Sequence, residues 1–456
     1  MSEISIQKKL QHLYWRAGIG PALDLNTTNT SVKKEVDKIF SVAKEYTAID
    51  VVEFDRPTRM EKQSMSDEER KKMLREGKAE KFVLGYACIL KMVEEKNVLR
   101  EKMAFFWSNH FACKINEPNF AQNYINVIRE NALGKFSDLL TAVSKTAGML
   151  QYLNNNQNKK RSPNENFARE VMELFTLGRG NYSEQDVKES ARAFTGWSFD
   201  KTGEFRLRIF EHDDDTKTFL GKTGNFNGDD ILKMIIEKKQ CANFITRKIY
   251  RNFVNDKPDE AIIEKLADVF YLSNYDIEKL MQTIFSAEWF YDQKNIGVKI
   301  KSPIDLLAGM MQLYNVRFTD TSRFLAYQRA LGQELFQPPN VAGWPVDKGW
   351  IDNATLMLRL KMPEWLFEKK HFNIPTKATY DVQQAQLRNK DEKQDLITFD
   401  FSKFENTFAN IPAEQQIKAI ANFLLVPESS NNVSTAINNN TQAGEKIKSI
   451  TLKVMA

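Results

Sequence analysis

Cysteine and histidine are scarce in this 456-residue chain, which has three cysteines and four histidines. The cysteines, at positions 88, 113 and 241, are far apart and odd in number. They predict free thiols and argue against a disulfide framework or a paired-cysteine zinc site. The four histidines leave few candidates for a multi-histidine metal site.

Several common catalytic motifs are also absent. The chain has no phosphate-binding GxxxxGK[ST], no GxGxxG after a strand, no HExxH and no GxSxG. These absences argue against nucleotide hydrolysis, nicotinamide chemistry, the common zinc proteases and the ordinary serine hydrolases.

Neither charge sign is in excess, because 65 basic and 60 acidic side chains leave a net charge of +5. A balance this close gives no reason to expect a nucleic acid partner. No apolar run approaches the roughly 20 residues that span a bilayer. The opening "MSEISIQKKL" lacks the apolar middle of a secretory signal. As written, the sequence predicts a cytoplasmic protein without a transmembrane segment.

What the chain does contain is mostly helical periodicity. In "NVLREKMAFFWSNHFA", Leu99, Met103, Phe106 and His110 fall within about 60° of one another on a helical wheel. The alternating "FRLRIF" predicts a short β-hairpin near residues 199–210.

The stretch "FQPPNVAGWPVDKGW" holds three prolines, two glycines and two tryptophans, and predicts a long, rigid, aromatic loop. We therefore predict a mainly α protein: a large multi-helix domain with a small β-hairpin and long ordered loops. This domain is expected to span residues 1–370. Residues 371–456 are expected to form a helical extension packed on it, with polar flexible stretches.

The stretch "SPNENFAREVMELFTLGRG" has the start and stop signals of a complete helix. Ser162 and Glu165 have the spacing of a capping box, while Gly178 and Gly180 predict the end of the helix. "YSEQDVKESARAFTGWS" repeats the arrangement with Ser183 as the cap.

On the first of these helices, Asn166, Glu170 and Glu173 share one edge, with Arg169 beside them. An ordinary amphipathic helix would show the same pattern, with a solvated face and an Arg169–Glu173 pair. The alternative is a carboxylate pair that lines a cleft for proton transfer or for a hard cation.

Histidine and aspartate supply the other candidate reactive groups. His110 ends an apolar stripe, so it is either a core histidine or a proton shuttle or metal ligand that faces the acidic helix, beside Trp107 and Asn109. In "HDDDTK", His212 and Asp213 are candidate ligands for a divalent metal ion, the cofactor these residues would hold. Aspartates are also ordinary turn residues.

The proline-rich loop offers Phe336, Trp344 and Trp350 as an aromatic wall for a ligand, or as a rigid cover over the helices. At least one of its tryptophans is expected to pack in the core.

Six segments in order resemble the bacterial family called domain of unknown function 1800 (DUF 1800), from about His12 to beyond Leu360. They are "HLYWRAGIG", "EKMAFFWSNHFA", "SPNENFAREVMELFTLG", "YSEQDVKESARAFTGWSF", "HDDDTKTFLG" and "GQELFQPPNVAGWP". The resemblance implies no established activity. Relatives are often exported, which implies a periplasmic or secreted location and an envelope role if a leader has been removed.

Two positions depart from the family pattern. Ser108 and Phe175 stand where the family usually has histidine. If those histidines bind metal or move protons in relatives, this chain has lost that chemistry, so the departures favour binding over catalysis.

The segments are expected to converge on one pocket that joins His110, the Glu170 edge, His212 with Asp213, and the Trp344 loop. The predicted ligand-binding residues are Trp107, Asn109, Asn166, Arg169, Trp197 and Trp344. The predicted function is a ligand-binding or assembly protein with a polar and aromatic cleft, whose partner is a small molecule or an envelope protein. The alternative is a hydrolase-like enzyme that uses Glu170 or Glu173 with His110, assisted by a metal ion.

Overall fold

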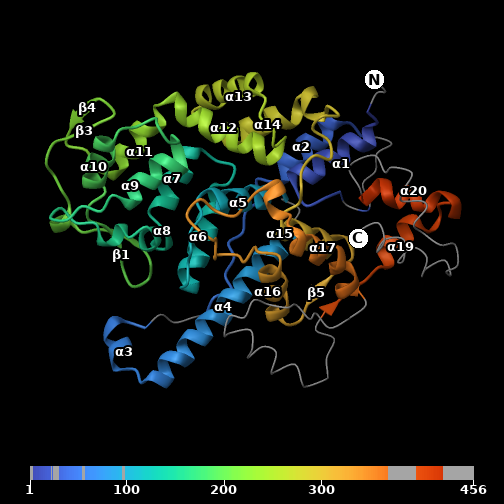
Figure 1. Ribbon diagram of the computed structural model, residues 1–456, viewed down its shortest axis with the longest axis horizontal. Coiled ribbons are helices and arrows are strands. Elements are labelled where there is room, and N and C mark those ends of the chain that lie inside the picture. The colour runs from blue at the N-terminus through green and yellow to red at the C-terminus, as the bar shows by residue number, and fades with distance from the viewer. Residues whose placement is uncertain are drawn as a thin grey trace. The chain divides into compact units, whose positions relative to one another are not determined.

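The chain folds mainly into helices, as the apolar periodicity predicts (Figure 1). The computed structural model describes residues 4–21, 23, 30–53, 57–94, 98–367 and 397–424. Two units can be separated. Unit 1 comprises residues 1–32, 291–334 and 345–456, and unit 2 comprises residues 33–290 and 335–344. The predicted domain boundary at residue 370 lies outside the described residues.

Unit 2 carries most of the family-like segments. Its helices are α2 (Val32–Val42), α3 (Arg59–Ser64), α4 (Asp67–Glu94), α5 (Val98–His110), α6 (Pro118–Asn131), α7 (Phe136–Ser144), α8 (Ala147–Tyr152), α9 (Asn166–Glu170), α10 (Glu184–Ala193), α11 (Gly228–Ile236), α12 (Lys239–Phe253), α13 (Glu260–Leu272) and α14 (Ile277–Ser286). Short 3₁₀ turns are η1 (Asn155–Gln157), η3 (Ile209–Glu211) and η4 (Glu288–Tyr291), while η2 (Val171–Thr176) is a π-helical turn.

Two small hairpins complete unit 2. Strand β1 (Trp197–Phe199) pairs antiparallel with β2 (Phe205–Leu207), which confirms the predicted hairpin. A second hairpin, β3 (Lys217–Phe219) with β4 (Lys222–Gly224), follows the aspartate-rich turn.

An aromatic cluster forms part of the core of unit 2. Trp107 and Phe136 have ring centres 5.5 Å apart, and Phe111 lies 6.1 Å from each. All three rings are almost completely buried. The buried Trp107 indole is also satisfied, because its Nε1 donates to the Ala132 carbonyl at 3.0 Å. This tryptophan, a predicted ligand contact, therefore serves the core and fixes α5 against the end of α6.

Unit 1 joins the N-terminal helix to the later part of the chain. Its elements are α1 (Ile6–Ala17), α15 (Pro303–Leu313), β5 (Arg317–Phe318), α16 (Thr321–Ala330), the 3₁₀ turn η5 (Asp347–Trp350), α17 (Asn353–Phe367), β6 (Ile397–Thr398), α19 (Ser402–Ala409) and α20 (Ala413–Leu424). Strands β5 and β6 pair antiparallel. Three aromatic rings pack in its core at tilted angles: the Phe404 ring centre lies 5.1 Å from that of Tyr314 and 4.8 Å from that of Phe408.

The helix-start predictions had mixed outcomes. Ser183 does form a capping box with Asp186 at the start of α10. The box predicted at Ser162 is wrong, because α9 begins at Asn166 and its preceding residue makes no side-chain cap. Asn158 Oδ1 accepts the Asn164 amide at 2.9 Å, which holds the intervening residues in a loop.

No helix within the described ranges is both long and apolar enough to cross a membrane.

Candidate functional site

His110 ends α5 inside a cage of aromatic rings. Phe106 stacks on its imidazole with ring centres 6.3 Å apart, and Phe111 meets it edge-on at 4.5 Å. Its Nε2 lies 3.0 Å from the Phe175 carbonyl oxygen, and its Nδ1 lies 3.3 Å from Lys248 Nζ. Since a carbonyl can only accept, Nε2 carries the proton and Nδ1 accepts from the lysine. Burial, and then the Lys248 charge, lowers the pKa of His110 well below its usual value, so the ring is neutral near pH 7.

The carbonyl groups that bind His110 and Lys248 come from η2, the π-helical turn that continues α9. Lys248 Nζ donates to the Leu174 carbonyl at 2.8 Å, and His110 donates to the next carbonyl, that of Phe175. Donors of this kind satisfy the last carbonyls of a helix. Burial lowers the Lys248 pKa to about 8. The histidine does meet the acidic helix, as predicted, but at its carbonyl end and not at its carboxylates.

The two candidate carboxylates of this helix have different environments. Glu173 accepts from Arg179 Nε and from the Tyr182 hydroxyl, both at 3.0 Å, and the Arg179 bond is the main cause of its lowered pKa. Glu170 is half-buried, and burial followed by the Glu173 charge raises its pKa. Within the described part of the chain, no hydrogen bond joins His110 to either carboxylate. The predicted acid–base partners are therefore not brought into contact.

The ion-pair partners of Arg169 are not the predicted Glu173 but two other glutamates. Its two Nη atoms each lie 2.8 Å from a Glu184 oxygen, and Nη2 also lies 3.2 Å from Glu165. These bonds join α9 to the start of α10. Because these carboxylates neutralise the Arg169 guanidinium, Arg169 positions the two helices relative to each other.

Asn166 and Trp197, also predicted to bind ligand, make local contacts. Asn166 Nδ2 donates to the Leu153 carbonyl at 3.2 Å. Trp197 is buried, meets the Phe194 ring edge-on at 5.1 Å, and has Lys145 Nζ 5.3 Å from its ring centre. Both residues thus connect neighbouring elements of unit 2.

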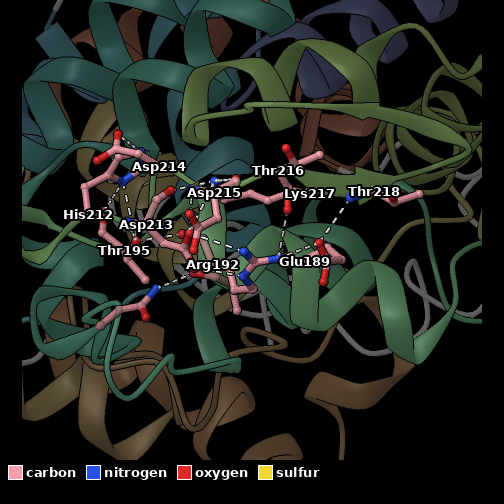
Figure 2. A network of polar contacts seen from close by, with 12 residues as sticks. Glu189, Arg192, Thr195, His212, Asp213, Asp214, Asp215, Thr216, Lys217 and Thr218 are labelled. Atoms are coloured by element: carbon pink, nitrogen blue, oxygen red, sulfur yellow. Dashed lines mark hydrogen bonds and ion pairs between the residues drawn. The ribbon is translucent and has the colours of Figure 1, made fainter.

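The aspartate-rich turn is held by a dense polar network (Figure 2). The Arg192 guanidinium binds Asp213 with two nitrogens, at 2.8 and 3.2 Å, and Glu189 with a third at 2.9 Å. The Arg192 bond is the main factor that keeps the pKa of Asp213 low despite its burial. Bidentate pairing of this kind fixes geometry as well as charge.

His212 belongs to the same network. Its Nδ1 donates to the Thr195 carbonyl at 2.7 Å, and the Asp213 amide donates to Thr195 Oγ1 at 2.8 Å (Figure 2). The buried Lys217 ammonium donates to the carbonyls of Asp213 and Asp215, at 2.5 and 2.9 Å. His212 and Asp213 therefore lock the turn to the end of α10.

The donor set of this turn suits an ion pair better than the predicted divalent cation. Asp213 already accepts from Arg192 and, at 2.9 Å, from the Asp215 amide. Across the described residues, no three histidine, cysteine, aspartate or glutamate side chains are grouped as metal ligands. A cation here would have to compete with the guanidinium.

The proline-rich loop closes on α5 through a backbone contact. Asn109 Oδ1 accepts the Trp344 amide at 2.7 Å, and the Ile115 amide donates to the Phe336 carbonyl at 3.1 Å. Gly343 has φ +91°, and a Cβ there would lie 2.3 Å from Asn109 Oδ1. Only glycine lets the loop approach this closely. Asn109 therefore positions Trp344, one of the residues predicted to bind ligand.

Beneath this loop lies a pocket of unit 2 with a cavity of about 30 Å³, partly open to solvent and mainly apolar. It is formed by α4, α5, α6 and the 335–344 segment. Its lining residues are Cys88, Ile89, Met92, Glu101, Ala104, Phe105, Ser108, Cys113, Tyr124, Ile125, Arg129, Leu335, Phe336 and Trp344. Two of the three residues proposed as an aromatic wall, Phe336 and Trp344, thus line one pocket, and Trp350 belongs to unit 1.

The polar groups that line the pocket are largely satisfied. Arg129 binds Glu101 with two nitrogens, both at 2.8 Å, in a pair that is almost fully buried. Ser108 Oγ donates to the Phe105 carbonyl at 2.8 Å. Burial raises the pKa of the Cys88 thiol to about 12. The pocket therefore offers neutral thiols and hydroxyl lone pairs and has no uncompensated charge.

Comparison with known proteins decides the family. The profile described as "Protein of unknown function (DUF1800)" matches residues 12–454, nearly the whole chain. The chain belongs to the DUF1800 family. No curated protein and no solved structure matches it.

Ser108 and Phe175, the two positions expected to depart from the family pattern, have different surroundings. Ser108 lines the pocket. The Phe175 ring centre lies 6.0 Å from that of His110, and the Phe175 carbonyl oxygen accepts a hydrogen bond from His110 Nε2. A histidine at position 108 would add a titratable group to the pocket, whereas the present serine leaves it uncharged.

The DUF1800 segments gather into separate clusters. Trp344 and Ser108 line the pocket, but His110, Glu170, His212 and Asp213 are not among its lining residues. Sequence reasoning missed the pocket-facing residues Cys88, Glu101, Cys113 and Arg129. Helical periodicity from α4 to α6 could have placed them on buried faces, but no local pattern indicates that these faces meet.

Proposed function

We propose that this DUF1800 protein binds a small, uncharged, largely apolar molecule in the pocket beneath the 335–344 loop. The observation that carries the proposal is the pocket itself, which is formed in part by two of the family-like segments and has Phe336 and Trp344 in its wall. Apolar clefts with a few placed polar groups are the usual form of small-molecule sites.

The lining limits the occupant. The Glu101–Arg129 charges are satisfied by each other, so a charged ligand would find no counter-ion. A cavity of 30 Å³ holds about two water molecules. The expected occupant is therefore a small aromatic molecule that places one ring edge in the cavity and leaves the rest of its rings at the open side. The serine and tyrosine hydroxyls can accept a hydrogen bond from it.

Indole is a suitable probe, and Ser108→Leu is the blocking variant. The wild-type protein is expected to bind indole saturably in calorimetry and to gain about 1.4 kcal/mol of stability at ten times the dissociation constant. In Ser108→Leu the added side chain fills the cavity, and binding should fall by about tenfold or more.

The matched control is Ser137→Leu, a half-buried serine on α7 outside the pocket lining. This variant should bind indole as the wild type does. Absent saturable binding by the wild type, or equal binding by Ser108→Leu, would reject the proposal.

A second candidate is acid–base catalysis by Glu170 and Glu173. The supporting observation is that the pKa of Glu170 is raised while that of Glu173 is lowered. Carboxylates with separated pKa values are typical of acid–base pairs. A panel of p-nitrophenyl esters, phosphates and glycosides tests it: turnover that disappears in Glu170→Gln supports catalysis, and no turnover by the wild type removes it.

A further inference from the structure

Three exposed apolar side chains lie close together in the sequence of unit 2, at the end of β2 and in the following turn η3. Leu207, Ile209 and Phe210 are 43%, 68% and 92% exposed. We name these three residues the apolar tip. Single exposed apolar residues are common, but a cluster of this kind, in one short segment, indicates an interaction site.

The apolar tip is held firmly by its own backbone. The Arg208 amide donates to the Gly196 carbonyl at 2.8 Å, and the Lys160 amide donates to the Glu211 carbonyl at 2.9 Å. His212, directly after η3, is fixed by Thr195 (Figure 2). The polar network around Asp213 therefore presents the tip in one conformation, and little ordering entropy would be lost on binding.

Basic side chains surround the apolar tip. Residues 159–161 and 200–211 together carry six basic and three acidic side chains. Two of these acids are already paired: Asp200 with Arg206 at 2.8 Å, and Glu211 with Lys159 at 2.8 Å. The surface next to the exposed phenylalanine is therefore net positive.

We propose that the apolar tip inserts into the interface of an anionic membrane, with the surrounding basic side chains at the lipid headgroups. A protein partner of standard size would need about 800 Å² and 20–30 residues on this side, whereas three apolar side chains suffice for shallow insertion. Interfacial binding combines buried apolar area with attraction to anionic lipid, and the tip has both features.

Co-sedimentation with vesicles tests this proposal on the full chain. The protein is expected to bind phosphatidylcholine vesicles that contain phosphatidylglycerol, to bind pure phosphatidylcholine much more weakly, and to dissociate at high salt. Phe210→Ser should weaken binding by about tenfold or more. Lys160→Gln with Arg161→Gln, two exposed basic residues of the same segment, should weaken it by about fivefold per residue.

Leu272→Ser is the matched control, since Leu272 is 82% exposed but lies at the end of α13. It should bind vesicles as the wild type does, and circular dichroism should show every variant folded. The proposal is overturned if the wild type does not bind anionic vesicles or if Phe210→Ser binds them as well as the wild type does. It is also overturned if Phe210→Ser instead abolishes self-association in sedimentation velocity, which would assign the apolar tip to a second copy.

Discussion

Lys248 is a buried side chain that stabilises the fold through hydrogen bonds and also makes the stability of the fold depend on pH. Its ammonium satisfies the Leu174 carbonyl and contacts His110 Nδ1, and it lies 4.7 Å from the Phe244 ring centre. Burial disfavours the charged form, so its pKa falls to about 8. The neutral His110 beside it adds no positive charge, which makes the arrangement tolerable near pH 7.

The first prediction concerns Lys248→Met. An unfolded lysine holds its proton to about pH 10.4, whereas folded Lys248 releases it near pH 8. Between these values the unfolded chain binds more protons, so the free energy of unfolding rises with pH. The wild type should gain about 1 kcal/mol relative to Lys248→Met between pH 7 and pH 9, as measured by urea denaturation.

Lys233→Met provides the comparison, because Lys233 is an exposed lysine on the neighbouring α11. Its stability curve should follow the wild-type curve across this range. Parallel curves for Lys248→Met and the wild type would show that Lys248 is solvated and does not cap the π-helical turn as a buried cation.

At the scale of elements, sequence spacing predicted helix starts and hairpins correctly only where the interacting residues are close together in the sequence. The Ser183 capping box and the β1–β2 hairpin depend on residues within ten positions of each other, and both form. The Ser162 box fails because Asn158 draws the Asn164 amide into a loop. The π-helical turn η2 is capped by α5 and α12, so its geometry depends on contacts that local periodicity does not contain.

The second prediction tests the close approach that anchors the β1–β2 hairpin. Gly196 has φ +79°, and a Cβ there would lie 2.7 Å from the Arg208 carbonyl oxygen. Gly221 has a similar φ, +84°, but nothing within 4 Å of its Cβ position. Gly221→Ala should cost about 1–2 kcal/mol from backbone strain alone. Gly196→Ala should cost about 1–3 kcal/mol more because of the clash.

Denaturant unfolding of the two alanine variants measures this difference, and hydrogen exchange locates it. Faster exchange is expected at residues 206–211 in Gly196→Ala but not in Gly221→Ala. Equal destabilisation of the two variants would mean that the hairpin can move away from Gly196, so that the apolar tip is not rigidly presented.

At the scale of the whole molecule, the helical class follows from composition and periodicity, but the grouping of helices does not. Unit 1 brings the first residues together with segments roughly 300 to 400 positions later. Gln11 Nε2, for example, donates to the Asn422 carbonyl at 2.8 Å. The pocket likewise joins α4, α5 and α6 to a loop more than 200 residues away. Such pairings are decided by complementary buried faces, which a single sequence does not reveal.

The third prediction follows from the separate cores of the two units. Phe404 is fully buried in unit 1 among Tyr314 and Phe408, so Phe404→Ala should cost about 3–5 kcal/mol. If each core stabilises mainly its own unit, amide exchange should accelerate across α15 and α19 while α5 and α6 keep wild-type protection and indole binding persists. The reciprocal variant Phe136→Ala, in the aromatic core of unit 2, should accelerate exchange in α5 and α6 and abolish indole binding. Uniform acceleration throughout the chain in both variants would instead require one cooperative folding unit, because a local cavity can reach distant amides only through global unfolding.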